Sequence, residues 1–241
     1  KKAGGTLKPR IDPRDISETV REAIRQPGRY ANIYITGGSI PGPDNRFEAE
    51  LEGYIELLQA IGENFSTRRF PSQLTSSSFD EAQLARLFNE TGLLTYTTDI
   101  EVLDEEKFNW ICPGKAERMG FKEWKRRLIA AVDIFGRGHV NTGIVGGVEL
   151  ATPHGFATED EALAATLAGA EELASQGVGT VATIFRPYPS SAFQKQQVPS
   201  LEYFVRLAQG LDAARRRHGL NMDMDNYRRC GNHGDSDLSR I

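Results

Sequence analysis

The sequence predicts an α/β fold in which parallel strands alternate with crossover helices. Short apolar runs typical of buried strands are separated by amphipathic stretches of roughly 12 to 18 residues that have helical spacing. Strands joined through helices of this length run parallel, because each connection has to cross back over the sheet. The chain of 241 residues, 39% of them hydrophobic, is long enough to form one large domain.

Capping residues mark where several helices begin. Asp12 precedes Pro13, and this pair combines a side-chain acceptor with a residue suited to the first helical turn. Thr158 with Glu161 has the spacing of a capping box, and Ser200 precedes the last predicted helix. Helices are predicted over residues 13–27, 46–61, 79–92, 121–135, 158–175 and 200–218.

Five strands are predicted, over residues 31–35, 67–74, 93–102, 178–185 and from residue 139 onward. The second strand would have to tolerate Pro71, which cannot donate a hydrogen bond to a neighbouring strand. Five strand–helix units are too few for a closed eight-unit barrel. The first predicted helix has no strand before it, so a preceding sixth strand is expected to be missing. We expect one barrel-like domain over residues 1–220 and a polar tail over residues 221–241.

Charge and cysteine usage restrict the class of protein. The chain has 29 basic and 33 acidic residues, a net charge of −4, and its basic residues are spread through helical segments. Nucleic acid is therefore not expected as the main partner. Two cysteines do not make a disulfide framework, which favours a cytoplasmic setting. There is no apolar run of about 18 residues and no leader before the first helix, so neither a membrane span nor a secretion signal is expected.

Polar and glycine-rich residues follow the predicted strands. The carboxyl ends of parallel strands meet at one edge of a sheet, where loops can form a ligand site. Bare glycine backbone allows a ligand to approach closely, although the same glycines could simply form tight turns. These strand ends comprise Gly37, Gly38 and Ser39, then Ser72 and Gln73, then Asp99 and Glu101, then residues 141–149, and finally Arg186.

Two acids and one arginine at these ends have side chains suited to binding. Asp99 and Glu101 stand at alternate positions of a predicted strand, so their side chains should point the same way. They could accept hydrogen bonds from a ribose diol, or else cap a helix or form salt bridges. Arg186 begins an Arg-Pro-Tyr-Pro sequence and could clamp a carboxylate or phosphate, or be a solvated surface arginine.

The cysteines are weaker candidates for chemistry. Cys112 lies in an Ile-Cys-Pro-Gly-Lys sequence and is expected to be a half-buried structural thiol, not a nucleophile. Cys230 and His233 could bind a metal only with ligands from elsewhere. The sequence contains no Gly-Lys-Ser/Thr phosphate loop and no serine elbow.

Two of the strand-end stretches resemble motifs of the radical S-adenosylmethionine (radical SAM) enzymes. Residues 36–39, Thr-Gly-Gly-Ser, look like the Gly-Gly-Glu motif, with Ser39 where glutamate is usual. Residues 142–149 are similar to the Gly-x-Ile-x-Gly-x-x-Glu motif. In this second stretch Ile144, Gly146 and Glu149 match, and Thr142 replaces the first glycine.

The resemblance is closest to the biotin synthase branch of that superfamily. The Gly-Ile-Val-Gly sequence is similar to that branch, and residues 99–101 lie where it has an Asn-Leu-Asp type of sequence. The likeness extends over residues 14–218, with the motifs in the same order and spacing. It implies a partial (β/α)6 TIM-like barrel and two cofactors, SAM and a [4Fe-4S] cluster.

The resemblance also implies a reaction. SAM is cleaved reductively at the cluster, and the resulting 5′-deoxyadenosyl radical abstracts hydrogen from a small-molecule substrate. The electron comes from a donor such as flavodoxin or ferredoxin. By this resemblance, Gly37, Gly38 and Ser39 would bind the methionine end of SAM, and Asp99 and Glu101 would bind the ribose. Ile144, in the motif that includes Gly146 and Glu149, would contact the adenine. Arg186 would bind SAM or an anionic group of the substrate.

One hallmark of the family is absent. The Cys-x-x-x-Cys-x-x-Cys loop that holds the cluster does not occur in the sequence, and we expect these cysteines, like the missing strand, upstream of Lys1. Cys230 is a further metal-ligand candidate. If the chain is complete, it cannot hold the cluster in the usual way. Two alternatives are then a cluster-free barrel lyase or aldolase, whose Schiff-base lysine no predicted strand provides, and a non-catalytic binding protein that retains the fold.

Overall fold

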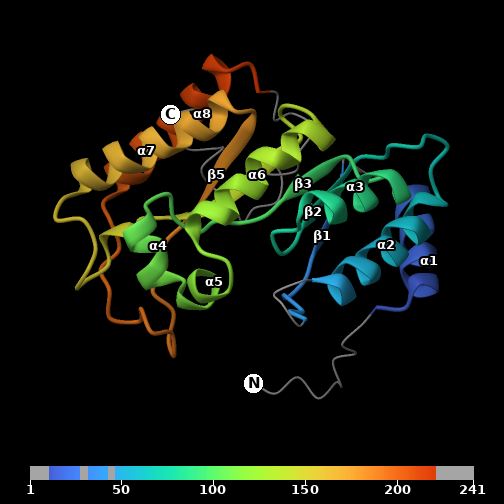
Figure 1. The fold of residues 1–241 in the computed structure, drawn as a ribbon, viewed down its shortest axis with the longest axis horizontal. Coiled ribbons are helices and arrows are strands. Elements are labelled where there is room, and N and C mark those ends of the chain that lie inside the picture. The colour runs from blue at the N-terminus through green and yellow to red at the C-terminus, as the bar shows by residue number, and fades with distance from the viewer. Residues whose placement is uncertain (1–10, 28–31, 43–46, 221–241) are drawn as a thin grey trace.

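Five parallel strands form one sheet in the order of the chain (Figure 1). The computed structural model describes residues 11–27, 32–42 and 47–220. Every strand pairs with its successor in the sequence, so the predicted α/β class and the parallel strands are confirmed. Parallel neighbours joined by right-handed crossovers place their helices on one face, which is the arrangement of a barrel wall. The strands are β1 (Ile33–Thr36), β2 (Ser72–Thr75), β3 (Thr95–Thr97), β4 (Val140–Gly146) and β5 (Val178–Ile184).

The helices follow one another from α1 beside one end of the sheet to α8 at the other (Figure 1). All six predicted helices are present. The segment between β3 and α6 was predicted only as a connector, but it contains α4 and α5. These helices have seven and six residues, too few for helical periodicity to be recognised in a sequence. The helices are α1 (Pro13–Arg25), α2 (Glu48–Gly62), α3 (Glu81–Glu90), α4 (Glu105–Ile111), α5 (Pro113–Arg118), α6 (Phe121–Phe135), the 3-10 turn η2 (Val148–Leu150), α7 (Glu159–Ser175) and α8 (Leu201–Arg217).

The predicted N-caps are confirmed. Asp12 accepts a hydrogen bond from the backbone N–H of Arg14 (2.9 Å), and Thr158 accepts one from the N–H of Glu161 (3.2 Å). The capping box predicted at Thr158 is only half formed, because the Glu161 carboxylate accepts from the N–H of Ala157 (3.2 Å) and not from that of Thr158. The Ser200 hydroxyl caps α8 in the same way. These side chains satisfy N–H groups that have no partner within the first helical turn, which explains why each helix begins where it does.

Two predicted strands are shorter than expected. The segment expected over residues 67–74 becomes a strand only at Ser72, immediately after Pro71. Proline has no N–H to donate to a neighbouring strand, although its carbonyl accepts from the N–H of Ile33 (2.9 Å). The segment expected over residues 93–102 narrows to β3, followed by an isolated parallel bridge at Glu101.

The face of the sheet that packs on the helices forms the core. Leu74, Tyr96, Val140 and Val178 are fully buried and lie side by side in register across four strands. The Tyr96 ring stacks on Phe135 of α6 at a centroid distance of 5.6 Å. This row joins β2 through β5 to the helical layer.

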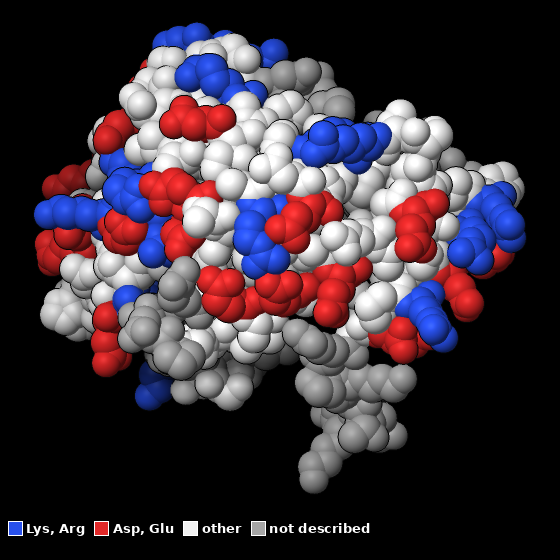
Figure 2. Space-filling view, turned by 45° about the vertical axis from the view of Figure 1, so that its right-hand side comes forward, with Lys and Arg blue, Asp and Glu red and all other residues white. Residues whose placement is uncertain are grey.

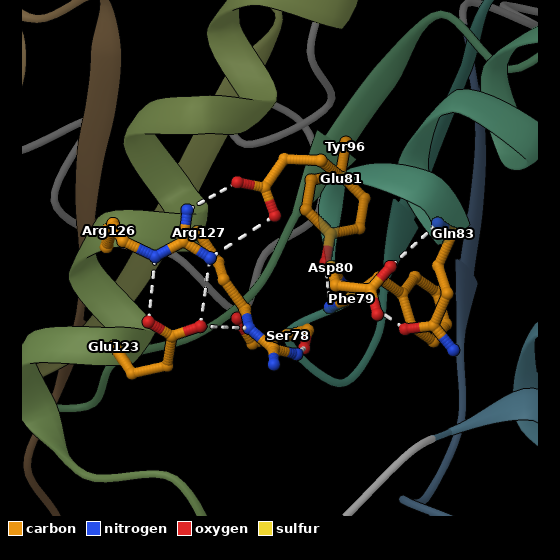
Figure 3. A network of polar contacts seen from close by, with 9 residues as sticks. All are labelled: Ser78, Phe79, Asp80, Glu81, Gln83, Tyr96, Glu123, Arg126 and Arg127. Carbon is orange, nitrogen blue, oxygen red and sulfur yellow. Dashed lines mark hydrogen bonds and ion pairs between the residues drawn. The ribbon is translucent and has the colours of Figure 1, made fainter.

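The Tyr96 hydroxyl also anchors the loop after β2 (Figure 3). It donates to the backbone carbonyl of Ser77 (2.8 Å) and accepts from the backbone N–H of Phe79 (3.2 Å). Both backbone groups belong to the segment that leads into α3, so this one buried phenol fixes the start of that helix against β3.

Charged residues of both signs alternate on the surface. In the view of Figure 2, basic and acidic side chains lie next to one another on the face turned to the viewer. Arg126 of α6 is an example, because it forms ion pairs with Glu123 on its own helix and with Glu81 on α3 (Figure 3). Such exposed pairs contribute little, about 0 to 1 kcal/mol. Among the helices of the described residues, none combines the length and hydrophobicity needed to span a membrane.

Replacing Tyr96 with phenylalanine should destabilise the fold. The ring would remain in place, but the Ser77 carbonyl and the Phe79 N–H would lose their partner, at a cost of about 2 kcal/mol in the free energy of unfolding. Urea titration measures this loss. The matched control is Tyr188→Phe, whose side chain is 73% exposed and which should change stability by less than about 0.5 kcal/mol. Equal effects at the two tyrosines would contradict the anchoring role.

Candidate functional site

The sequence-predicted residues collect at one edge of the sheet. Because all five strands are parallel, the loops after β1, β3, β4 and β5 leave the sheet at the same edge. Neighbouring strands lie roughly 4.8 Å apart, so the ends of β1 and β4 are separated by roughly 14 Å along this edge. Gly38, Glu101 and Ile144 therefore lie on the same side of the molecule. Three residues expected at strand ends lie elsewhere, since Ser72 is the first residue of β2, and Gln73 and Asn141 are the second residues of their strands.

Asp99 is held against β4 by a close backbone contact. Its carboxylate accepts a hydrogen bond from the N–H of Gly143 (2.8 Å). A Cβ atom at Gly143 would come within 2.5 Å of the same carboxylate oxygen, so glycine is required for this approach. Burial raises the pKa of Asp99, and the nearby charge of Glu101 raises it further.

Glu101 lies beside β4 for a reason that differs from the prediction. The backbone N–H of Glu101 donates to the carbonyl of Gly143 (3.0 Å), and its carbonyl accepts from Val145 (2.8 Å). Its φ is +70°, a left-handed conformation that non-glycine residues seldom adopt. Strand alternation therefore does not extend from Asp99 to Glu101, and the expectation of two side chains at alternate strand positions was wrong. Asp99 and Glu101 are neighbours because the Asp99 carboxylate and the Glu101 backbone both bind to β4.

Lys115 of α5 completes this acidic group and was missed from the sequence. Its ammonium lies 2.6 Å from Oε1 of Glu101 and 2.7 Å from the backbone carbonyl of Asp99. It also lies 4.6 Å from the centre of the Trp124 ring. Pro113 stands at the first position of α5. Proline favours that position in helices, so it could have indicated a short helix that carries Lys115. The lysine offsets one of the two acidic charges at the edge.

The loop after β1 is fixed by a second residue missed from the sequence, Glu50 of α2. Its side chain is buried, and its carboxylate accepts hydrogen bonds from the N–H groups of Ile40 and Ser77 (2.9 Å each). The Ser77 hydroxyl lies 2.8 Å from both Glu50 and the Ser39 hydroxyl. Glu50 thus ties the loops after β1 and β2 together, and Ser39 belongs to this network.

Gly38 presents open backbone at the end of β1. A Cβ atom added at Gly38 would meet nothing within 4 Å, whereas one at Gly37 would lie 2.7 Å from the Tyr54 hydroxyl oxygen. Both glycines line a pocket of about 160 Å³, together with Glu50 and Tyr54. Gly37 is therefore packed closely against Tyr54, and Gly38 is the position where a ligand can reach the main chain.

The residues of the β4 motif face inward. Ile144 belongs to the buried core, and Gly146 packs against Leu207 of α8. Glu149 is 2% exposed, and its carboxylate accepts hydrogen bonds from the N–H of Gly147 (2.8 Å) and the hydroxyls of Thr166 (3.2 Å) and Tyr203. Burial raises the pKa of Glu149. In this structure Glu149 fastens the exit of β4 to α7 and α8.

Arg186 and the cysteines complete the set of predicted residues. Arg186 follows β5, is exposed, and makes no hydrogen bond or ion pair with the described residues. Cys112 is half-buried, as predicted, and burial raises the pKa of its thiol to about 11, which keeps it protonated near neutral pH. Cys230 and His233 lie outside the described residues. Within the described ranges, no three His, Cys, Asp or Glu side chains are grouped closely enough to hold a metal ion.

No family model matches this chain. The chain is 25% identical over 203 residues to the bacteriochlorophyllide c C-7(1)-hydroxylase of Chlorobaculum limnaeum, a match that covers 81% of this chain and 47% of the relative. A crystal structure of a radical SAM methyltransferase from Sphaerobacter thermophilus matches with a TM-score of 0.53 and 20% identity, covering 82% of this chain and 52% of that one.

The structural match shows that the sheet and helices share the fold of part of a radical SAM methyltransferase. The chain spans about half the length of each relative.

Replacing Asp99 with asparagine should change how stability depends on pH. Asparagine retains the oxygen that accepts from Gly143 but does not titrate. In the wild type the pKa of Asp99 is raised in the folded state. Above about pH 4, the ordinary pKa of the group, the carboxyl therefore ionises more readily in the unfolded state, and the wild type loses stability as the pH rises. The variant should therefore gain stability relative to wild type as the pH rises from 4 to 7. Urea titrations at several pH values test this, and a constant difference would contradict it.

Proposed function

We propose that this chain is the SAM-binding part of a radical SAM enzyme of the biotin-synthase-like branch, built on a (β/α)6 barrel. In such an enzyme, reductive cleavage of SAM supplies a radical that takes hydrogen from a small-molecule substrate. The observation that carries the proposal is the arrangement at one sheet edge of open backbone at Gly38, an acidic group at Glu101 and the glycine-rich exit of β4. The fold shared with a radical SAM methyltransferase supports it.

Each part of this edge suits one part of SAM. Open backbone at Gly38, next to the buried Glu50 carboxylate, would hold the methionine end. Glu101 would accept hydrogen bonds from the ribose diol, as acidic residues do in nucleotide sites. The ammonium of Lys115 now lies against that carboxylate, so a bound ribose would share Glu101 with Lys115. Adenine would lie against the exit of β4 near Ile144, and Arg186 would bind SAM or an anionic substrate group.

The described residues do not suit a [4Fe-4S] cluster. A cluster of this type needs several thiolates, and the described part of the chain contains one cysteine, Cys112, which is half-buried and protonated near neutral pH. Its ligands would have to lie outside the described residues. We propose a small-molecule substrate and an electron donor of the flavodoxin or ferredoxin type. The hydroxylase and the methyltransferase differ in reaction, so the proposal stops at hydrogen abstraction.

The lyase or aldolase alternative is not favoured. Its Schiff-base chemistry requires an uncharged, accessible amine near a strand end. Lys115 is the lysine found at this edge in the described structure, but it is engaged in an ion pair with Glu101 and stacked over Trp124. A non-catalytic binding protein would share the SAM site but contain no iron.

Substitutions at Gly38 and Glu101 test the SAM site. Gly38→Ala should fold, because its new methyl group meets nothing, but the methyl group should obstruct the methionine end. Glu101→Ala should remove the ribose acceptor. Each change should weaken SAM binding by about tenfold or more in anaerobic calorimetry, which corresponds to roughly 1.4 kcal/mol.

Matched controls are available for both substitutions. Gly114→Ala also places a methyl group in open space, and Glu106→Ala removes an exposed acid of α4. Both controls should bind SAM as the wild type does. Unchanged SAM binding in both Gly38→Ala and Glu101→Ala would refute the assignment of this edge. Iron and sulfide content of the full-length, anaerobically purified protein then separates an enzyme from a cluster-free binding protein.

A further inference from the structure

The face of the sheet opposite the helices carries a row of polar side chains. Tyr96 points toward the helices, so the next residue, Thr97, points away from them. Asn141 of β4 pairs with Thr97 in register and shares this face. Gln73 of β2 also belongs to it, because its amide nitrogen donates to the Thr97 hydroxyl (3.1 Å). Three polar groups from three adjacent strands are therefore side by side.

Three amide atoms in this row lack hydrogen-bond partners. Asn141 is 0% exposed, and neither its Oδ1 nor its Nδ2 has a partner. Gln73 is also 0% exposed, and its Oε1 has no partner. A buried polar atom without a partner costs about 1 to 3 kcal/mol. Buried amides are normally satisfied, so three open positions within one row indicate a group that is bound there.

The strands that carry the row contain no charged residue. The five strands lack aspartate, glutamate, lysine, arginine and histidine, and the acidic group that approaches β4 nearest to the row, Asp99, already accepts from the N–H of Gly143, two residues beyond Asn141. Burial of an ion in such a place is costly without a counter-charge. The bound group is therefore uncharged.

The open positions specify the pattern of donors and acceptors. Asn141 needs a donor for its oxygen and an acceptor for its nitrogen, and Gln73 needs one more donor. A side-chain amide pairs well with a planar group that presents a donor and an acceptor side by side, as asparagine does with the edge of a nucleobase. Lactams, primary carboxamides and nucleobases share this chemistry.

We propose that Asn141 and Gln73 form a binding site on the inner face of the sheet for a neutral amide-type group of the substrate. Only the identification of this ligand as the substrate rests on the proposed function. The site lies below the edge that would hold SAM, because Asn141 is the second residue of β4 and the SAM edge begins at its exit.

The test uses 2-pyrrolidinone, a small lactam, as the probe. Its addition to the full-length protein should shift the side-chain amide signals of Asn141 and Gln73 in ¹H–¹⁵N NMR spectra. Cyclopentanone has the same ring size but no donor, and it should bind about three- to tenfold more weakly because one hydrogen bond is lost. Acetate, which is charged, should shift neither signal. Equal binding of all three probes, or no shift with 2-pyrrolidinone, would overturn the proposal.

Substitution of Asn141 provides a readout that a purely structural role would not give. Asn141→Leu removes the unpartnered amide, so it should raise the Tm of the ligand-free protein by roughly 3 °C while abolishing the effect of 2-pyrrolidinone on Gln73. The matched control is Thr142→Val. The Thr142 hydroxyl donates to the Thr98 carbonyl (2.9 Å) and accepts from the N–H of Ile100 (3.0 Å), so its loss should lower the Tm.

A second variant guards against poor packing of leucine. Asn141→Ala should also abolish the shift at Gln73. If both Asn141 variants lower the Tm and leave the lactam shift unchanged, the amide has a structural role and the inference fails. SAM binding measured on the same samples separates the two proposals. If the wild-type protein shows the lactam shift but does not bind SAM, only the SAM proposal is refuted. If it binds SAM but shows no lactam shift, only the amide site is refuted.

Discussion

Pairing of the segment after β3 with β4 is the interaction on which the site depends. Glu101 forms a parallel bridge with Ile144, and the Asp99 carboxylate accepts from Gly143 one residue earlier. Without this pairing, residues 98–101 would be an ordinary loop, and two acidic side chains would have no fixed position. Glycine at position 143 allows the approach, and the left-handed backbone at Glu101 turns the chain away toward α4.

Polarity is divided between the strands and their exits. The charged side chains of Glu101 and Lys115 lie beyond the strand ends, where they are partly exposed to water. The strands themselves contain only neutral residues, including the unpartnered Asn141. In the two proposals, the charged cofactor therefore binds at the edge of the sheet and the uncharged group binds further inside. This separation follows from the cost of burying charge compared with that of burying amides.

Short sequence patterns placed several of these residues at the correct edge of the sheet, although some reasons were wrong. Gly38 was expected to present bare backbone, and in the structure it does. Asp99 and Glu101 were expected to lie together through strand alternation, but pairing with β4 is what unites them. Pro71 was expected inside a strand, and the strand begins after it because proline cannot donate to a neighbour. Glu50 and Lys115 were not foreseen, since each acts across a distance of more than ten residues in the chain.

The sequence by itself determined the α/β class, the parallel direction of the strands, the starts of the capped helices and the glycine-rich exits of β1 and β4. These features depend on local periodicity, caps and turns, and neighbouring residues contain the whole signal. Only the tertiary structure decided which carboxylates are buried, which lysine offsets them, and which amides are left without partners. Those properties depend on contacts between segments far apart in the chain, and local patterns do not encode them.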